Sequence, residues 1–201
     1  MKPLKLYLLS LLLIIASSCA PVRPHIPEYP GSVDSFINSA SEKFDSMNAA
    51  FSISFQKKSG QKVTADAAAD VCPEGISARF YQMGMLVGNL DTLAGRSTGY
   101  EVYEEVLKDA LLWWRIPGYE TEEVPGTVML SAGNRRLVLA TRTYVPLSQT
   151  IMLPDSDAVI AYSDYRSVGG TFPFWYPFKI RVIYRGNSLE LEMSRVSLKH
   201  S

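Results

Sequence analysis

Histidine and cysteine are scarce in this sequence. Its 201 residues include two histidines, His25 and His200, near opposite ends, and two cysteines, Cys19 and Cys72. So few cysteines exclude a disulfide-rich scaffold and a cysteine-built zinc site, and the placement of the histidines argues against a histidine-centred active site. A glycine-rich phosphate loop, a catalytic triad motif and metal-ligand spacing are missing as well. We therefore interpret the protein as a non-enzyme that needs no cofactor or metal.

The sequence also lacks an excess of charge of either sign. Lysine and arginine number 20, as do aspartate and glutamate, so the formal charge is zero. That balance gives no support for a nucleic-acid partner. With 47% hydrophobic residues, the composition is ordinary for a globular protein and too apolar for a disordered one. The length fits one domain with a substantial core.

An apolar run near the N-terminus predicts export. Two lysines precede residues 6–16, which match the n- and h-regions of a secretory signal. The run is shorter than the ~20 residues that a membrane-spanning helix needs. Small residues follow, directly before Cys19, and this ending resembles the bacterial lipobox. It departs from the usual pattern at Ala16, where leucine is most common. The alternative is an ordinary signal with an incidental cysteine.

The lipobox resemblance implies cleavage before Cys19, so that residues 1–18 form the signal peptide. Cys19 would then carry a thioether-linked diacylglycerol and an N-acyl chain such as palmitate. Two or three acyl chains anchor a protein firmly, because each buried CH2 contributes about 0.8 kcal/mol. The next residue is Ala20, not the aspartate that commonly retains lipoproteins at the inner membrane. By resemblance, the protein is anchored in the outer membrane and faces the periplasm.

Two amphipathic helices are predicted in the chain that follows. Four prolines within 20–32 predict that residues 19–32 form a semi-rigid tether. Ser32 is a suitable N-cap for a helix with apolar residues at helical spacing, namely Val33, Phe36, Ile37, Ala40, Phe44 and Met47. A second helix is predicted over 103–114, where Val106, Leu107, Ala110, Leu111 and Trp114 share one stripe.

Most of the remaining chain alternates with a period of two. Turn residues separate short segments that we interpret as strands: 49–56, 63–71, 76–84, 85–93, 127–130, 135–145, 149–153, 158–165, 178–184 and 189–198. Roughly ten strands and two helices favour a mainly β (α+β) fold. We expect one curved antiparallel sheet with the helices on one face.

The order of elements resembles the LolA/LolB-like superfamily of periplasmic lipoprotein carriers and outer-membrane lipoprotein-sorting proteins. The resemblance is strongest in the C-terminal third, in the blocks Tyr144–Leu147, Ile160–Arg166, Gly170–Pro173, Phe178–Val182 and Leu189–Leu198. It implies that residues 33–201 form a lipid-binding domain. In this family an incomplete barrel has helices covering its concave face and encloses a cavity for acyl chains.

The most apolar segment outside the signal contains Leu111, Trp113 and Trp114. It is a candidate for the ligand cavity or for a mobile lid, and tryptophan also favours membrane interfaces. The alternative is a core helix. Adjacent helical positions diverge by about 100°, so we do not expect both tryptophans to face one core. Phe51, Ile53 and Phe55, which alternate along a predicted strand, are further candidates for the cavity wall.

An aromatic segment over 172–178 is a candidate for contact with a membrane or partner. Its aromatic residues include Phe172, Phe174, Trp175 and Tyr176. Two prolines make a central strand unfavourable there, so we expect a partly exposed loop. Rings packed on the rim of the domain are the alternative, and the residues do not decide between the two.

Charged groups are interpreted mainly as solvated faces. Acidic pairs at positions 104–105 and 122–123 flank predicted elements, although acid–base or cation sites use the same residue types. Arg135 and Arg136 are candidates for contact with acidic phospholipid. Because of the strand pleat, one of the two must point outward.

The leading hypothesis is an outer-membrane lipoprotein that binds lipid or lipoprotein acyl chains in a half-barrel cavity. It would act in lipid or lipoprotein sorting, a form of transport, or in envelope biogenesis. The alternative is a non-enzymatic assembly lipoprotein that uses the same fold to bind an envelope protein. A deep apolar cavity favours the first hypothesis, and a polar or self-filled concave face favours the second.

Replacing the lipobox cysteine tests the anchor. Cys19→Ser should leave an unacylated, unprocessed precursor, because a hydroxyl cannot form the thioether and the lipid-dependent peptidase would not act. Metabolic labelling with a fatty acid and the gel mobility of the membrane fraction measure this outcome. A Cys19→Ser chain that is processed and membrane-bound like the wild type would show that the lipobox interpretation is wrong.

Overall fold

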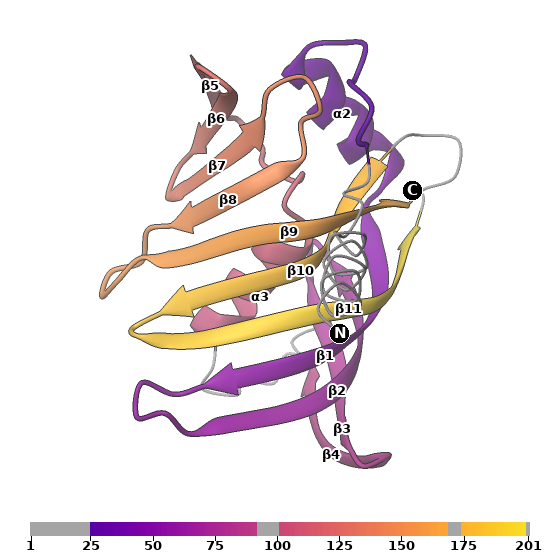
Figure 1. Cartoon of the computed structure of the whole chain (residues 1–201), viewed down its shortest axis with the longest axis vertical. Coiled ribbons are helices and arrows are strands. Elements are labelled where there is room, and N and C mark those ends of the chain that lie inside the picture. The colour runs from indigo at the N-terminus through magenta and orange to yellow at the C-terminus, as the bar shows by residue number, and fades with distance from the viewer. Residues whose placement is uncertain (1–24, 92–100, 169–173, 200–201) are drawn as a thin grey trace, which may run out of the picture.

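The structure, a computed structural model, describes residues 25–91, 101–168 and 174–199. In this part of the chain, eleven strands form one antiparallel sheet, accompanied by helices α2 (Val33–Lys43) and α3 (Glu101–Leu111) (Figure 1). The strands are β1 (Ser46–Gln56), β2 (Lys62–Cys72), β3 (Gly75–Gln82), β4 (Met85–Asp91), β5 (Glu120–Val124), β6 (Thr127–Ala132), β7 (Arg135–Ala140), β8 (Pro146–Ile151), β9 (Ala158–Val168), β10 (Phe174–Tyr184) and β11 (Asn187–Lys199).

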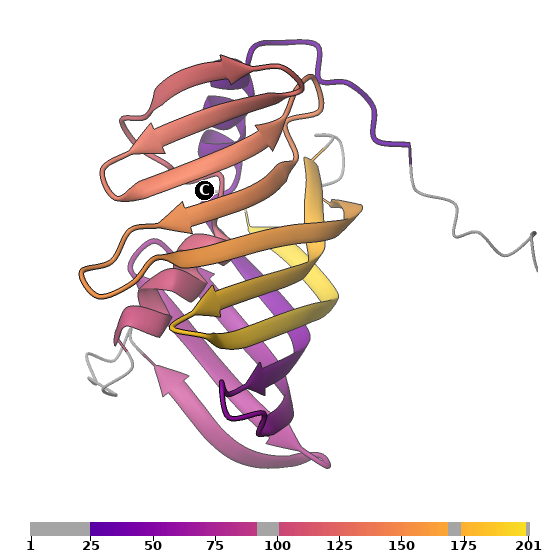
Figure 2. The ribbon, with the colours of Figure 1, turned by 60° about the vertical axis from the view of Figure 1, so that its left-hand side comes forward.

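The sheet is a meander joined through its first and last strands. Its order is β4-β3-β2-β1-β11-β10-β9-β8-β7-β6-β5, so β1 and β11 are the one neighbouring pair that is not consecutive in sequence. The edges are β4 and β5, and the sheet therefore does not close. It curls around α3, which lies on its concave side (Figure 2). The predicted fold, a curved antiparallel sheet forming an incomplete barrel with helices on its concave side, is confirmed.

Helix α2 begins where the sequence predicts and ends earlier. The Ser32 side chain accepts a hydrogen bond from the Ser35 N–H at 3.2 Å and caps the first turn. Phe44 is already extended, with φ −130°. The prediction that the helix reaches Met47 is wrong, because Met47 lies in β1. Met47 fits the helical spacing of apolar residues by coincidence. It is buried because alternate residues of β1 enter the same core as the apolar face of α2.

Helix α3 also ends earlier than expected, at Leu111. Residues 112–114 form a turn, and both Trp113 and Trp114 are fully buried. The expectation that they could not face one core is wrong, because the 100° rule holds only inside a regular helix. Their rings are nearly perpendicular to each other, with centroids 5.8 Å apart.

Aromatic rings from α2, β10 and the turn after α3 fill the interior. Phe174 stacks on Trp113, with ring centroids 5.4 Å apart, and on Phe36 at 5.9 Å. It also meets the Trp114 ring edge-on at 5.2 Å. Contacts of this kind add to the free energy gained by burial. This part of the concave face is therefore filled by the protein's own side chains.

Strand β10 begins at Phe174, so the loop predicted over 172–178 is wrong from that residue onward. Pro177 is opposite Tyr165 of β9, whereas the pairing of β10 with β11 starts only at Lys179. A proline without an N–H is tolerated because this stretch of β10 has one strand neighbour. Strand β5, which was not predicted, is an exposed edge strand in which glutamates replace the usual apolar alternation.

Side chains of the sheet satisfy the carbonyl groups at the end of α3. Such carbonyls lack partners within the helix. The Tyr176 hydroxyl donates to the Leu111 carbonyl at 3.0 Å, and the Tyr162 hydroxyl lies 3.3 Å from the Ala110 carbonyl. Both tyrosines are buried, and burial raises the pKa of each hydroxyl far above its usual value. They therefore stay protonated and remain available as donors.

Removing one hydroxyl should measure this capping. Tyr176→Phe leaves the buried Leu111 carbonyl without its donor and should lower the free energy of unfolding by about 1–3 kcal/mol. The matched control is Tyr184→Phe, because the Tyr184 hydroxyl forms no hydrogen bond to a described residue. Urea unfolding followed by tryptophan fluorescence measures both variants. Equal losses in the two would contradict the capping role.

Candidate functional site

The predicted lid and cavity residues divide into two groups. Leu111, Trp113 and Trp114 are fully buried in the hydrophobic core, and Phe51 is buried as well. Ile53 and Phe55 are half-buried on the same face of β1 as Phe51. Their roles in ligand binding stay predictions, but only the second group has surface free for a ligand.

Ile53 and Phe55 belong to a larger set of half-exposed apolar side chains on the concave side. Strand register places Phe80 of β3 and Leu90 of β4 on this face as well. Phe80 is the partner of Ala67, which is the partner of Phe51. Leu90 is the partner of Ala78, which is the partner of Ala69. Helix α3, which contacts β2 and β3, contributes two more. We call this set the concave apolar patch: Ile53, Phe55, Phe80, Leu90, Tyr103 and Leu107.

The rest of the concave face is closed by packing. One row of partners crosses eight strands from β2 to β6, and its exposure falls sharply along the way. Val63 at its β2 end is 50% exposed and Phe55 is half-buried, whereas the residues from β11 onward are buried. In order, the row is Val63, Phe55, Leu189, Val182, Ile160, Gln149, Leu137 and Leu130.

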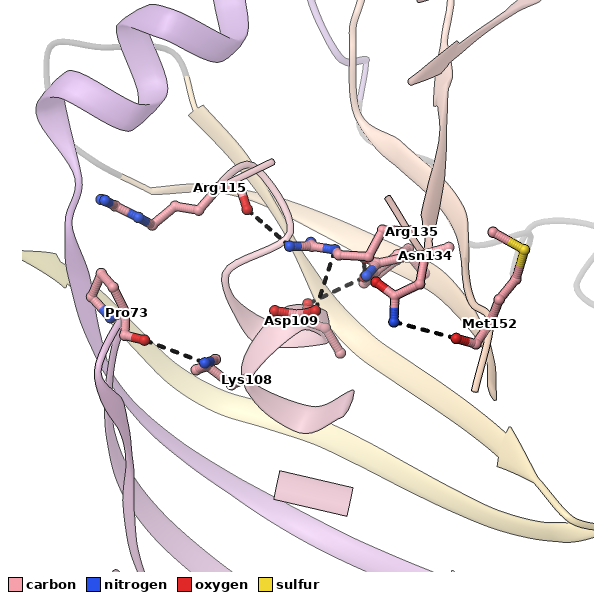
Figure 3. Close-up of polar contacts among 10 residues, drawn as sticks. Pro73, Lys108, Asp109, Arg115, Asn134, Arg135 and Met152 are labelled. Carbon is pink, nitrogen blue, oxygen red and sulfur yellow. Dashed lines mark hydrogen bonds and ion pairs between the residues drawn. The ribbon is translucent and has the colours of Figure 1, made fainter. Parts of the chain in front are cut away.

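A polar cluster lies beneath α3 within this buried region. Arg135 of β7 approaches Asp109 of α3, with 3.3 Å between Nε and Oδ2, close enough for an ion pair but not aligned as a hydrogen bond. Its Nη1 donates to the Arg115 carbonyl at 2.9 Å (Figure 3). Gln149 accepts a hydrogen bond from Tyr162 at 2.9 Å. The cluster therefore connects α3 to three strands.

Burial dominates the electrostatics of this cluster. The side chains of Arg135 and Asp109 are 12% and 15% exposed. Burial raises the pKa of the Asp109 carboxyl, and the nearby charges of Arg135 and Lys108 offset only part of that rise. Arg135 Nη2 and Gln149 Nε2 have no hydrogen-bond partner among the described residues. The cluster thus fixes the position of α3 at a cost in desolvation.

The predicted aromatic contact surface is mostly internal. Phe174 and Tyr176 are fully buried, Trp175 is half-buried, and Phe172 lies outside the described residues. In this structure, Phe174 and Tyr176 are core residues with no surface for a membrane or partner. Cys19, the predicted lipidation site, also lies outside the described residues.

An exposed apolar hairpin that sequence reasoning missed lies at one edge of the sheet. Met83 is 93% exposed at the turn between β3 and β4, and the next strand is exposed over Met85, Leu86 and Val87. Met83 and Gly84 have φ values of 51° and 77°. Asparagine, aspartate or glycine usually take such positions. The signal in the sequence was the apolar run on both sides of a turn, where polar residues are the norm.

Neither a metal site nor a spanning helix is found in the part of the chain that the structure describes. Residues 25–91, 101–168 and 174–199 contain no group of three or more histidine, cysteine or acidic residues that could hold a metal ion. Within the same ranges, no helix has the length and hydropathy to cross a bilayer. One of the predicted arginine pair, Arg136, points outward as the pleat requires, and Arg135 points into the cluster.

No protein-family model matches the sequence, and no curated protein matches it. Solved structures do match. A LolA superfamily protein from Nitrosomonas europaea covers 84% of this chain and 94% of its own, with a TM-score of 0.50 at 12% identity. A domain from Vibrio parahaemolyticus, assigned to outer membrane lipoprotein sorting, covers 82% and 90%, with a TM-score of 0.52 at 13% identity. At these identities the likeness concerns the fold, and it shows that this chain adopts the LolA/LolB-like fold.

Proposed function

We propose that this protein is a lipid-anchored lipoprotein of the bacterial outer membrane that binds lipid or lipoprotein acyl chains against the concave apolar patch. Three findings support the proposal: the lipobox-like sequence before Cys19, the LolA/LolB-like fold, and the lipoprotein-sorting assignment of one protein that shares this fold. Its role would be lipid or lipoprotein sorting in the envelope, facing the periplasm.

The half-exposed state of the patch is the observation that carries the proposal. Apolar side chains such as Ile53, Phe55 and Leu107 retain exposed surface on the inner side of a curved sheet, beside a core that is otherwise closed. Covering them with an acyl chain gains roughly 25 cal/mol for each Å2 of apolar surface removed from water. No covalent chemistry is required, because partition of the chain supplies the binding energy.

The buried tryptophans take a different role in this proposal from the predicted lid. Trp113 and Trp114 are packed around Phe174, and the Trp114 indole N–H donates to the Phe44 carbonyl at 3.1 Å. Swinging this segment open would expose both indoles and break that bond. The two residues act instead as a fixed part of the core.

A charge placed in the patch should block acyl-chain binding. Ile53→Asp puts a carboxylate in contact with the bound chain, which is costly in an apolar environment, so the affinity should fall tenfold or more. The control is Ser52→Asp on the adjacent, exposed residue of the same strand, whose side chain points to the other face. The mature chain with Cys19→Ala is used, so that its own anchor cannot occupy the patch. Displacement of a fluorescent fatty acid by lipid measures the affinity.

Two results would decide against acyl binding. One is that the Cys19→Ala chain without a further substitution binds no fatty-acid probe. The other is that the Ile53→Asp and Ser52→Asp variants bind the probe equally well. Either would favour the alternative, an assembly lipoprotein that uses this fold to bind an envelope protein. The aromatic filling of the interior is the observation in favour of that alternative.

We further propose that the hairpin residues Met83, Met85, Leu86 and Val87 contact the membrane surface. Their exposure is unusual for a soluble surface. Leu86→Glu should weaken binding of the unacylated Cys19→Ala chain to phosphatidylethanolamine–phosphatidylglycerol vesicles by about tenfold, since burying one leucine contributes about 1.5–3 kcal/mol. Co-sedimentation with vesicles measures this.

The control for the hairpin is Val159→Glu, which changes a valine that is 45% exposed on β9. Both variants gain the same charge, so electrostatic repulsion from anionic lipid affects them alike. Equal loss of vesicle binding would show that the hairpin has no special contact with the membrane.

A further inference from the structure

A cavity of about 500 Å3 lies at the C-terminal end of α3, apart from the concave apolar patch. Its walls come from α2, the turn between β2 and β3, the last turn of α3, and the connection 112–119. A volume of this size is typical of small-molecule sites. Three stretches that are far apart in the sequence build it: α2, the β2–β3 turn, and the end of α3 with the connection that follows it.

Two cationic side chains reach this cavity without an acidic partner. Lys108 and Arg115 both line it, and neither forms an ion pair with a described residue. Lys108 Nζ donates a single hydrogen bond, to the Pro73 carbonyl at 3.3 Å, which leaves two of its protons free. The Arg115 side chain extends to the same side of α3 as Lys108 and Pro73, away from Arg135 (Figure 3).

The acidic side chains of the cavity wall and of the β2–β3 turn form no salt bridge with Lys108 or Arg115. Asp109 is the one carboxylate among the described lining residues, and it pairs with Arg135 of the sheet. Glu74 lies on the β2–β3 turn. Its pKa is lowered mainly by hydrogen bonds with the Cys72 thiol and with its own backbone, and to a lesser extent by the Arg115 charge. Glu74 is exposed and forms no ion pair with a described residue, so neither Lys108 nor Arg115 is held in a salt bridge.

The lining also has an apolar side. Ile37, Leu112 and Ile116 are buried core residues that form part of the wall. Ser41 adds a hydroxyl, which donates to the Trp114 carbonyl at 3.3 Å. A ligand that fits must therefore bear an anionic group for Lys108 and Arg115 and a small organic group for the apolar wall.

We propose that this cavity binds a phosphate ester, with the phosphate between Lys108 and Arg115. A phosphate offers several acceptor oxygens, so it can satisfy a guanidinium fork and an ammonium at once. The volume leaves room for the alcohol part of the ester against Ile37 and Ile116. This inference does not depend on acyl-chain binding at the concave apolar patch.

Titration calorimetry of the mature protein in a non-ionic detergent tests the site with sn-glycerol 3-phosphate, inorganic phosphate and glycerol. We expect glycerol 3-phosphate to bind and glycerol not to bind. Arg115→Gln and Lys108→Gln should each weaken binding by about tenfold, which corresponds to the loss of one charge-assisted contact. The control is Arg136→Gln, which removes an exposed charge from the outer face of β7 and should change the affinity less than twofold.

Nuclear magnetic resonance of the wild type provides a second test that does not depend on whether a variant folds. Addition of glycerol 3-phosphate should shift the side-chain Nε–H signal of Arg115 and leave that of Arg136 in place. The source of the ester follows from a further titration with short-chain phosphatidylglycerol. Tighter binding than that of glycerol 3-phosphate indicates a lipid headgroup, and equal or weaker binding indicates a soluble ester.

Either source supports the proposal. It is overturned if none of the phosphate probes binds, if Arg136→Gln weakens binding as much as Arg115→Gln, or if the Arg115 signal does not respond. Loss of fatty-acid binding in the Ile53→Asp chain with phosphate binding intact would separate this site from the acyl-chain surface.

Discussion

The structure depends on how the peptide carbonyls at the end of α3 are satisfied. The helix ends at the buried residues Ala110 and Leu111, and a buried carbonyl without a partner is costly. Tyr176 of β10 donates to the Leu111 carbonyl, and Arg135 of β7 donates to the Arg115 carbonyl in the segment that follows the helix. Placing Arg135 there requires an acid beside it, which explains Asp109 in a helix that is otherwise apolar on its inner face.

The sequence was sufficient for the fold class because the apolar period changes from helical to alternating at the correct places along the chain. It failed where local pattern and tertiary setting disagree. Strand β5 has no apolar alternation because both its faces are exposed, so its formation depends on pairing with β6. Pro177 looked incompatible with a strand because the sequence does not show that β11 begins to pair only beyond it.

The candidate site was predictable to a smaller extent. Alternation places Ile53 and Phe55 on the face of Phe51, but it cannot say which of the three keeps exposed surface, since that depends on where α3 crosses the sheet. The cavity lined by Lys108 and Arg115 could not be predicted for the same reason. Its walls come from three stretches that are far apart in the sequence, and no motif around Lys108 or Arg115 indicates that the two face one cavity.

The two ends of α3 therefore offer different possibilities for ligand entry. At the C-terminal end and in the segment that follows it, side chains from β7 and β10 donate to backbone carbonyls, and moving that end would leave these groups without partners. The N-terminal half presents Tyr103 and Leu107, which are half-exposed and lie on the concave apolar patch. Local opening is drawn from the parts of a fold with fewer buried contacts. If the concave apolar patch binds an acyl chain as we propose, the adjustment that admits it is expected beside Tyr103, with the C-terminal end of α3 as the fixed point.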